Sequence, residues 1–217
     1  MKSLLHFCVL LLVTQQIVCH LGVDVSQLFS TSTYDCMKKN GYSFVIPRGY
    51  CSFGGMDHNA VQNLNNAKNA GLTTDVYMFP CRGKSATTQA DEIVSGINGN
   101  LYGTIWIDVE TNPSSGCSWS GHDGNSNCQW LGELVNRLKS HGKNVGIYAS
   151  AVMWQSIFGS HTACTGFSSH PLWYAHYDGK ESFADFSAFG GWTKPHMKQF
   201  QGTTTLCGAG VDRNYLP

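Results

Sequence analysis

The chain has 217 residues, in which 14 Lys and Arg side chains balance 14 Asp and Glu side chains. A neutral chain lacks the basic surface expected of a protein that binds nucleic acid or an anionic membrane, so we expect neither partner. Hydrophobic residues make up 42% of the sequence and charged residues 13%, which excludes intrinsic disorder as the main state.

The first residues differ in character from the rest of the chain. Lys2 precedes a largely apolar run over Leu4–Val13, and small or apolar residues continue to Cys19. This layout is typical of a secretory signal peptide and is too short for a membrane span, although a buried N-terminal helix is the alternative. We therefore expect residues 1–19 to be a signal peptide and residues 20–217 to form one exported domain, which is extracellular or reaches the gut lumen or lysosome-related vesicles.

Nine cysteines fit an exported protein, because disulfides persist in oxidising compartments. Cleavage after Cys19 leaves seven cysteines and one odd thiol, whereas cleavage before it leaves eight. Cys117 and Cys128 flank a flexible Gly/Ser/Asn-rich stretch, and we predict that they pair; the other pairings stay open. A zinc site is the competing interpretation, but no C-x-x-C or H-x-x-x-H spacing occurs, so we expect no metal and no other cofactor.

After residue 20, short β-branched or aromatic runs alternate with helix-like stretches. The alternation predicts a parallel sheet with helical crossovers. The predicted strands are Gly22–Gln27, Ser43–Arg48, Thr74–Phe79, Thr104–Glu110, Val145–Ala149 and Leu172–Tyr177. The predicted helices are Ser32–Lys39, Asn59–Ala70, Thr87–Ile97, Gln129–Ser140 and Val152–Phe158, and Gly71 and Gly142 stand where helix C-caps belong.

The last third of the chain lacks helical patterns. Two further strand-like runs, Met197–Gln201 and Val211–Asn214, are separated by turn-rich sequence. Eight strands predict a closed α/β barrel, and the missing late helices account for a length below the roughly 250 residues of a full (β/α)8 fold. An open doubly wound sheet is the second choice, but no G-x-G-x-x-G motif follows the first strand.

Four acids lie within or directly after apolar runs predicted to be buried. They are Asp24, Asp108, Glu110 and Asp212. Carboxylates are rare in strands and costly to bury, so their presence there suggests a function. Asp75 also borders such a run, but at its start, which is the stabilising end of a barrel rather than the catalytic one.

Asp108 and Glu110 are two residues apart at the end of one strand, so they share a face with Cα atoms about 6.5 Å apart. We expect each to resist ionisation of the other and Asp108 to help hold a proton on Glu110. An acid beside a carboxylate is what glycoside hydrolysis requires. A bare D-x-E is equally compatible with a purely structural role.

Six segments in order along the chain carry a family resemblance. They are GVDVSQ over Gly22–Gln27, WIDVE over Trp106–Glu110, GIYAS over Gly146–Ser150, LWYAHYD over Leu172–Asp178, QFQ over Gln199–Gln201 and VDRN over Val211–Asn214. Together they resemble the family-25 glycoside hydrolases, the Chalaropsis-type lysozymes, and most of all the cysteine-richer secreted forms of nematodes and amoebae.

The resemblance implies a TIM-like α/β barrel of the modified (β/α)5(β)3 type. It also implies cleavage of the β-1,4 bond from N-acetylmuramic acid to N-acetylglucosamine in bacterial peptidoglycan, in defence or digestion, by a protein we expect to be monomeric. Matched by motif, Glu110 corresponds to the proton donor, Asp108 to its partner, Asp24 to the acid of the first strand and Asp212 to that of the last. The cysteines and the stretch Ser114–Asn127 depart from bacterial relatives.

Four aromatic residues near strand ends are candidate sugar-binding residues, because a ring face stacks on the C–H surface of a pyranose. They are Tyr148, Trp173, Tyr177 and Phe79, with barrel core as the alternative role for each. A catalytically silent glycan-binding or signalling barrel is the rival function. A chitinase is a third possibility, but the longer acidic motif that precedes D-x-E in those enzymes is missing here.

Overall fold

The computed structural model describes residues 20–217, so the predicted signal peptide lies outside the described residues. The strands are β1 (His20–Val25), β2 (Tyr42–Cys51), β3 (Gly55–Met56), β4 (Thr73–Thr74), β5 (Val76–Met78), β6 (Thr104–Asp108), β7 (Asn144–Ala149), β8 (Leu172–Ala175), β9 (Met197–Leu206) and β10 (Ala209–Leu216). The α-helices are α1 (Thr31–Lys39), α2 (Ala60–Asn69), α3 (Ala86–Gly96), α4 (Gly124–Ser140) and α5 (Ala151–Phe158).

Eight of these strands close into a barrel, which confirms the predicted fold. The order β1-β10-β9-β8-β7-β6-β5-β2 is closed by pairing of β1 with β2. Within the barrel, β1, β2 and β5 to β9 are mutually parallel, and β10 pairs antiparallel with both β9 and β1. A helix follows each of the first five barrel strands and none follows the last three, so the architecture is (β/α)5(β)3.

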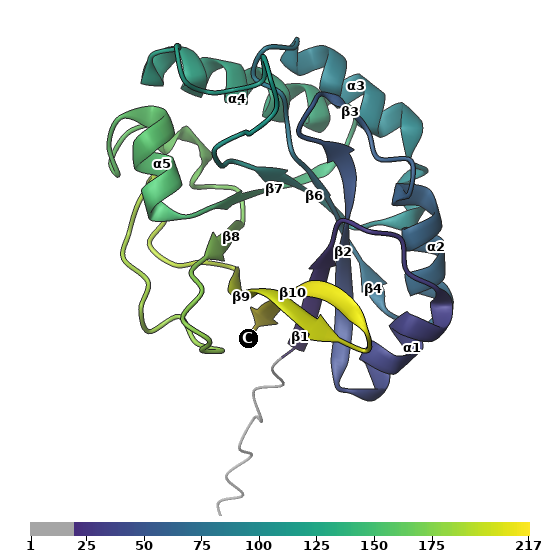
Figure 1. Ribbon diagram of the computed structural model, residues 1–217. Coiled ribbons are helices and arrows are strands. Elements are labelled where there is room, and N and C mark those ends of the chain that lie inside the picture. Colours follow the sequence, from purple (N-terminus) through teal and green to yellow (C-terminus); the bar gives the residue numbers. More distant parts are fainter. Residues whose placement is uncertain (1–19) are drawn as a thin grey trace, which may run out of the picture.

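The side of the barrel without helices is covered by irregular segments (Figure 1). Large rings take over the packing that a helix would supply there. Trp154 of α5 contacts Phe189 and Trp192 at ring-centroid distances of 6.1 and 4.9 Å, and Phe186 packs edge-on against Tyr174 of β8. Aromatic side chains cover much area per residue, so a short loop can shield the outer face of the last strands.

Helix ends follow the signals in the sequence. Ser30 and Asp123 accept hydrogen bonds from the first-turn amides of α1 and α4 at 3.3 and 3.0 Å, which satisfies donors that the helix itself leaves unpaired. Gly71 and Gly142 follow α2 and α4 with φ of +75° and +71°, as the C-cap prediction requires.

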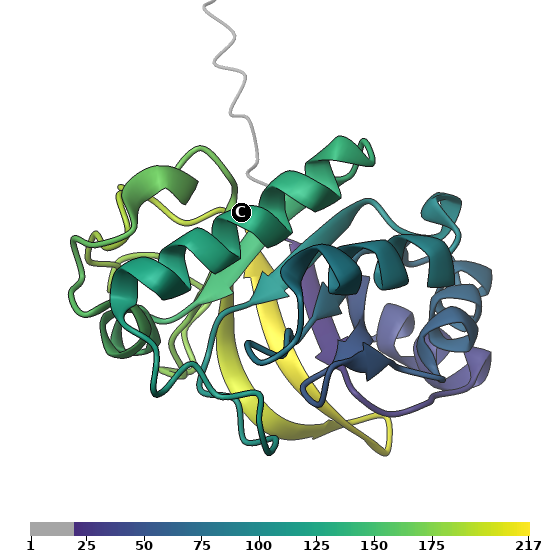
Figure 2. The ribbon, with the colours of Figure 1, turned by 90° about the horizontal axis from the view of Figure 1, so that it is seen from above.

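Several predicted boundaries were wrong by a few residues. Helix α4 begins at Gly124 rather than Gln129, and the strand predicted over Thr74–Phe79 is divided into β4 and β5 at Asp75. The strands predicted to end at Glu110 and Tyr177 end at Asp108 and Ala175. The hairpin of β9 and β10 is longer than predicted and projects past the other strands (Figure 2).

Three disulfides cross-link the domain, and the predicted Cys117–Cys128 bond is wrong. Cys117 pairs with Cys81, Cys128 with Cys164, and Cys36 with Cys207, while Cys51 is a buried free thiol. Helix α4 already includes Cys128, so the stretch between Cys117 and Cys128 is not the flexible loop that the prediction assumed. Within residues 20–217, no helix is long and apolar enough to cross a membrane.

The barrel interior is a packed layer of large side chains beneath its carboxyl end. Phe44, Ile46, Trp106, Tyr148, Trp173 and Met197 form this cluster, and each is at most 9% exposed. The polar side chains at the strand ends pack against this apolar layer.

Candidate active site

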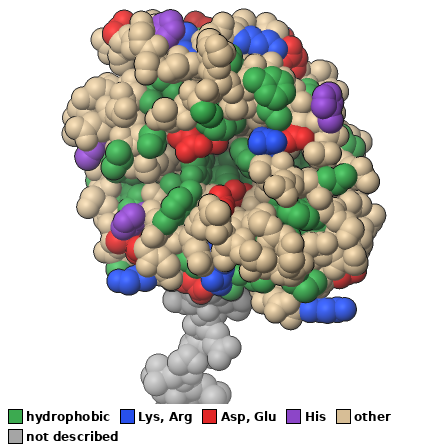
Figure 3. Space-filling view, in the orientation of Figure 1, with side chains coloured by type: hydrophobic (Ala, Val, Ile, Leu, Met, Phe, Trp, Pro, Cys, Tyr) green, Lys and Arg blue, Asp and Glu red, His purple; other side chains and the backbone are tan. Residues whose placement is uncertain are grey.

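Acidic side chains gather in a hollow in the middle of the face seen in Figure 3. The cavity there has a volume of about 80 Å³. Its lining consists of Asp24, Tyr77, Asp108, Glu110, Tyr148, Trp173, Gln199 and Asp212. Ligand pockets usually measure roughly 300–1,000 Å³, so this cavity by itself encloses only a small part of a ligand of ordinary size.

The fold brings the four predicted acids together. Asp24 near the end of β1 lies directly opposite Asp212 of antiparallel β10, so the two side chains share a face. Asp108 ends β6, and Glu110 follows two residues later; both line the same cavity as the first pair. All four therefore meet at the carboxyl end of the barrel, which is where (β/α)8 enzymes place their active sites.

Asp24 is held by two side-chain amides. Gln199 Nε2 and Asn214 Nδ2 each donate to Asp24 Oδ2 at 2.8 Å. Trp173 orients Asn214 in turn, because its indole Nε1 donates to the side-chain oxygen Oδ1 of Asn214 at 2.8 Å. Trp173 is only 2% exposed, so this series of hydrogen bonds holds the Asp24 carboxyl from the buried side.

Gln199 links the acids to two tyrosines. Its Oε1 accepts hydrogen bonds from the hydroxyls of Tyr148 and Tyr177 at 2.6 and 2.7 Å. Its Nε2 faces Asp24 and lies 3.4 Å from Asp212 Oδ2. The carboxylates accept hydrogen bonds, so they select the amide orientation that turns the NH2 group toward them.

Burial has the largest effect on the pKa values of the first acid pair, Asp24 and Asp212. It raises the pKa of Asp24 to about 7, with a further rise from the charge of Asp212, although the two amide hydrogen bonds oppose this. The pKa of Asp212 is also raised by burial, but the backbone amide of Thr203 donates to its Oδ1 at 2.6 Å and stabilises the ionised form.

Burial also raises the pKa values of the second pair, Asp108 and Glu110. Burial, followed by the charges of Glu110 and Asp24, raises the pKa of Asp108 well above its usual value, and Asp108 Oδ1 has no hydrogen-bond partner in the described part of the chain. Burial and then the charge of Asp212 raise the pKa of Glu110. The charges of Asp108 and Glu110 therefore disfavour each other's ionisation, as the sequence predicted, and the charge of Asp212 adds to the rise at Glu110. Which of the two holds the proton stays a prediction.

The four candidate aromatic residues occupy three kinds of position. Tyr148 and Trp173 line the cavity but are 7% and 2% exposed, so they form its floor. Tyr177 is 58% exposed and reaches the rim through its hydrogen bond to Gln199. Phe79, half-buried beyond β5, is not among the residues that line the cavity.

Three residues of the site were not assigned from the sequence. Gln199 and Asn214 lie in the QFQ and VDRN segments. An uncharged amide in an apolar strand does not by itself indicate a functional role. Tyr77 lines the cavity from β5, but aromatic residues are common in strands, so the sequence does not single it out. Only the barrel register, which aligns Gln199 with Asn214 and Ala175, shows that Gln199 faces the acids.

Asp75 has the structural role predicted for it. Its carboxylate accepts hydrogen bonds from Trp106 Nε1 and Thr104 N, both at 2.8 Å, at the amino end of the strands. It belongs to a separate hollow of about 660 Å³ that contains none of the four acids.

Comparisons with known proteins agree with this geometry. A family model described as Lysozyme-like protein 1 matches residues 15–200. The chain is 43% identical over 202 residues to Probable GH family 25 lysozyme 2 of Dictyostelium discoideum, with 90% of each chain covered. It is 39% identical over 203 residues to Lysozyme-like protein 5 of Caenorhabditis elegans, covering 90% of this chain and 91% of that one.

Among solved structures, the bacterial lysozyme from Streptomyces coelicolor superimposes with a TM-score of 0.77 at 25% identity, with 93% of each chain covered. The agreement therefore extends over nearly the whole described domain and includes the barrel topology. The chain belongs to the family-25 lysozymes and is a glycoside hydrolase.

Proposed function

We propose that the protein is a secreted lysozyme that hydrolyses the β-1,4 bond between N-acetylmuramic acid and N-acetylglucosamine in bacterial peptidoglycan. The observation that carries the proposal is the position of Glu110, a half-buried acid with a raised pKa that shares a cavity with three further carboxyl groups. A group of this kind keeps its proton at mildly acidic pH and can give it to a leaving oxygen.

In this mechanism Glu110 protonates the glycosidic oxygen. Asp212 is the carboxylate that stays ionised, because the Thr203 amide stabilises its charge and because that charge raises the pKa of both Asp24 and Glu110. Its charge opposes the positive charge that develops at the sugar ring as the bond breaks. Asp24, fixed by two amides, orients the substrate, and Asp108 supplies a buried protonated carboxyl beside the proton donor.

Export is supported by the three disulfides within residues 20–217 and by the N-terminal sequence pattern. The chain has no net positive charge and therefore little general attraction to anionic cell walls, so binding rests on contacts in the cavity. We assign the protein to antibacterial defence or to digestion of bacteria, acting as a monomer.

The test is a digestion of purified peptidoglycan with the recombinant mature domain, followed by mass analysis of the new reducing ends. The proposal predicts reducing ends of N-acetylmuramic acid and no release of sugars from chitin assayed in parallel. Reducing ends of N-acetylglucosamine would contradict the assigned bond. A folded protein that binds peptidoglycan fragments without cleaving them would support the silent-barrel alternative.

A further inference from the structure

The ammonium group of Lys198 on β9 is completely buried on the outer side of the barrel. Its Nζ donates to the Ser182 carbonyl oxygen at 3.0 Å, to Asp185 Oδ1 at 2.7 Å and to Asp178 Oδ1 at 2.8 Å. Lysine is almost never fully buried unless it is paired, and here three acceptors match its three protons. The loop between β8 and β9 is therefore fastened to the barrel by this charge cluster in the part that contains Asp178 and Asp185, and by the packing of Phe186, Phe189 and Trp192 in the part that follows.

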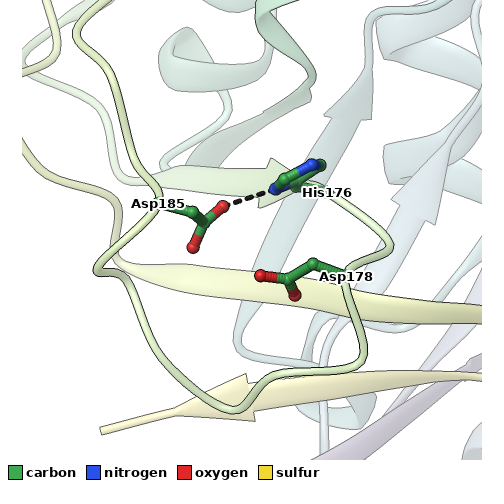
Figure 4. Close-up of side chains that lie close together, drawn as sticks. All are labelled: His176, Asp178 and Asp185. Atoms are coloured by element: carbon green, nitrogen blue, oxygen red, sulfur yellow. Dashed lines mark hydrogen bonds and ion pairs between the residues drawn. The ribbon is translucent and has the colours of Figure 1, made fainter.

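His176, Asp178 and Asp185 of this loop resemble a metal-binding group (Figure 4). One ligand atom of each lies within 4.8 Å of the others, and His176 Nδ1 lies 2.5 Å from Asp185 Oδ2. However, the Lys198 ammonium already binds Oδ1 of both aspartates, so the position that a cation would take is filled by the protein's own cation.

The two aspartates of the cluster stay ionised at mildly acidic pH. Burial disfavours ionisation of Asp185, but hydrogen bonds from Lys198 and then His176 outweigh it and lower its pKa to about 2. The pKa of Asp178 is also lowered, again because the hydrogen bond from Lys198 outweighs burial. The loop thus stays fastened in the mildly acidic range in which a protonated Glu110 would act.

The fastened loop carries Tyr177, the exposed ring at the rim of the cavity. The backbone amides on either side, those of His176 and Gly179, donate to the carbonyl oxygens of Gln199 and Phe200, both at 3.0 Å. The Tyr177 ring lies so close to Gly202 that a Cβ there would be 2.9 Å from it. Its hydroxyl donates to Gln199 Oε1, and Gln199 in turn donates to Asp24.

We propose that Lys198 is a positioning residue for hydrolysis, which acts by fastening the loop so that Tyr177 stays at the rim and keeps Gln199 turned toward Asp24 and Asp212. Lys198 and Gln199 are neighbours on β9 whose side chains point to opposite faces, one to the loop and one to the cavity. Ionic contacts outside the barrel thereby add to the hydrogen bonds with Tyr148 and Asp24 that orient this amide inside it. This inference rests on the proposed function for its consequence in catalysis, but not for its structural step.

The test variant is Asp185→Asn, and Asp91→Asn is its matched control. Asp91 also lies between a cation and a histidine, Arg137 and His141, each with a nitrogen 2.6 Å from Asp91 Oδ1, but it joins α3 to α4 away from the cavity. Lys198→Met is a second test variant, which removes the ammonium and retains most of the aliphatic stem. Thermal melting establishes that each variant is folded.

The first readout is the titration of Asp24 followed by carboxyl-carbon NMR, which needs no turnover. Because the Gln199 hydrogen bond lowers the pKa of Asp24, a loosened Gln199 should raise it in Asp185→Asn and leave it unchanged in Asp91→Asn. In a Tyr177→Phe background Asp185→Asn should have no further effect, since the connecting hydroxyl is gone. An Asp24 titration that Asp185→Asn and Lys198→Met leave unchanged would overturn the inference.

The second readout is the KM for a soluble peptidoglycan fragment. We expect Asp185→Asn to raise KM by about three- to tenfold with a smaller change in kcat, and we expect this increase to disappear in the Tyr177→Phe background. An equal increase in both backgrounds would show a general structural role and contradict the inference. If the Asp24 titration changes among the variants as predicted but the wild-type protein cleaves no peptidoglycan, the proposed function is refuted and the structural inference stands.

Discussion

The four cavity acids are held in an environment that disfavours their ionised forms, which has a cost in stability. Asp108 is the clearest case, since it is 6% exposed and has a carboxyl oxygen without a hydrogen-bond partner within residues 20–217. A carboxyl whose pKa is higher in the folded than in the unfolded state stabilises the fold below about pH 4. That contribution is lost as the pH rises through the folded-state pKa.

We therefore predict that Asp108→Asn stabilises the protein at pH 8 by about 1 kcal/mol, or roughly 2–4 °C in Tm, and has little effect at pH 4. Asp91→Asn is the control of opposite sign. Hydrogen bonds from Arg137 and His141 lower the pKa of Asp91 to about 2, so its removal should destabilise the protein at pH 8 and lose its effect toward pH 2. Melting curves across this pH range decide the matter, and an Asp108→Asn protein that melts earlier at pH 8 would contradict the electrostatic account.

Asp212 should control the pH at which activity is lost. Its charge raises the pKa of Glu110, so Asp212→Asn should lower that pKa and shift the alkaline limb of the kcat/KM profile to lower pH, in addition to lowering the rate. Asp108→Asn should also lower the rate but shift the limb less, because the charge that chiefly raises the pKa of Glu110 is that of Asp212. Comparison of the two profiles tests this, and a shift with Asp108→Asn alone would show that Asp108 is the group that holds the proton on Glu110.

The acids could be found from the sequence because a carboxylate inside an apolar run is conspicuous. Gln199 could not, since its importance depends on which strand pairs with which. The rise that Asp212 causes in the pKa of Glu110 also could not be deduced, because the spacing of Asp108 and Glu110 says nothing of a residue across the barrel.

At the scale of elements, the sequence predicted the eight barrel strands and five helices but missed where several of them end. Helix α4 illustrates the reason. Its first turn consists of small polar residues that resemble a loop, and the Asp123 cap rather than helix propensity starts the helix there. The disulfide prediction failed for the same reason, since it treated the stretch before Cys128 as free chain.

The disulfides offer a test at this scale. Cys36–Cys207 joins α1 to the turn of the β9–β10 hairpin across 171 residues, whereas Cys128–Cys164 spans 36. Because the other two disulfides shorten the first loop to roughly 100 residues, the chain-entropy argument predicts that replacing the first pair with serine destabilises the protein by about 0.9 kcal/mol more than replacing the second. Denaturant unfolding of the two double variants measures the difference. An equal or reversed order would show that local contacts, not closure of the chain, dominate.

At the scale of the whole molecule, a barrel with five helices and a loop-covered side accounts for the position of the site. Parallel strands direct their carboxyl ends to one face, and the antiparallel β10 adds Asp212 to that face from a strand running the other way. The strand count and the helix-poor end could be read from the sequence. The register of β1 against β10, which places Asp24 directly opposite Asp212, is visible only in the structure.

The most direct test of the central claim is the rate of peptidoglycan cleavage by Glu110→Gln. Glutamine preserves the size of the side chain and its hydrogen-bonding capacity but cannot donate the proton. General acid catalysis contributes about 10²–10⁴-fold, so we predict a loss of at least about 100-fold at an unchanged melting temperature. Glu133→Gln, an exposed position on α4, serves as the control and should cleave at the wild-type rate. A folded Glu110→Gln protein that cleaves peptidoglycan as fast as the wild type would contradict the account.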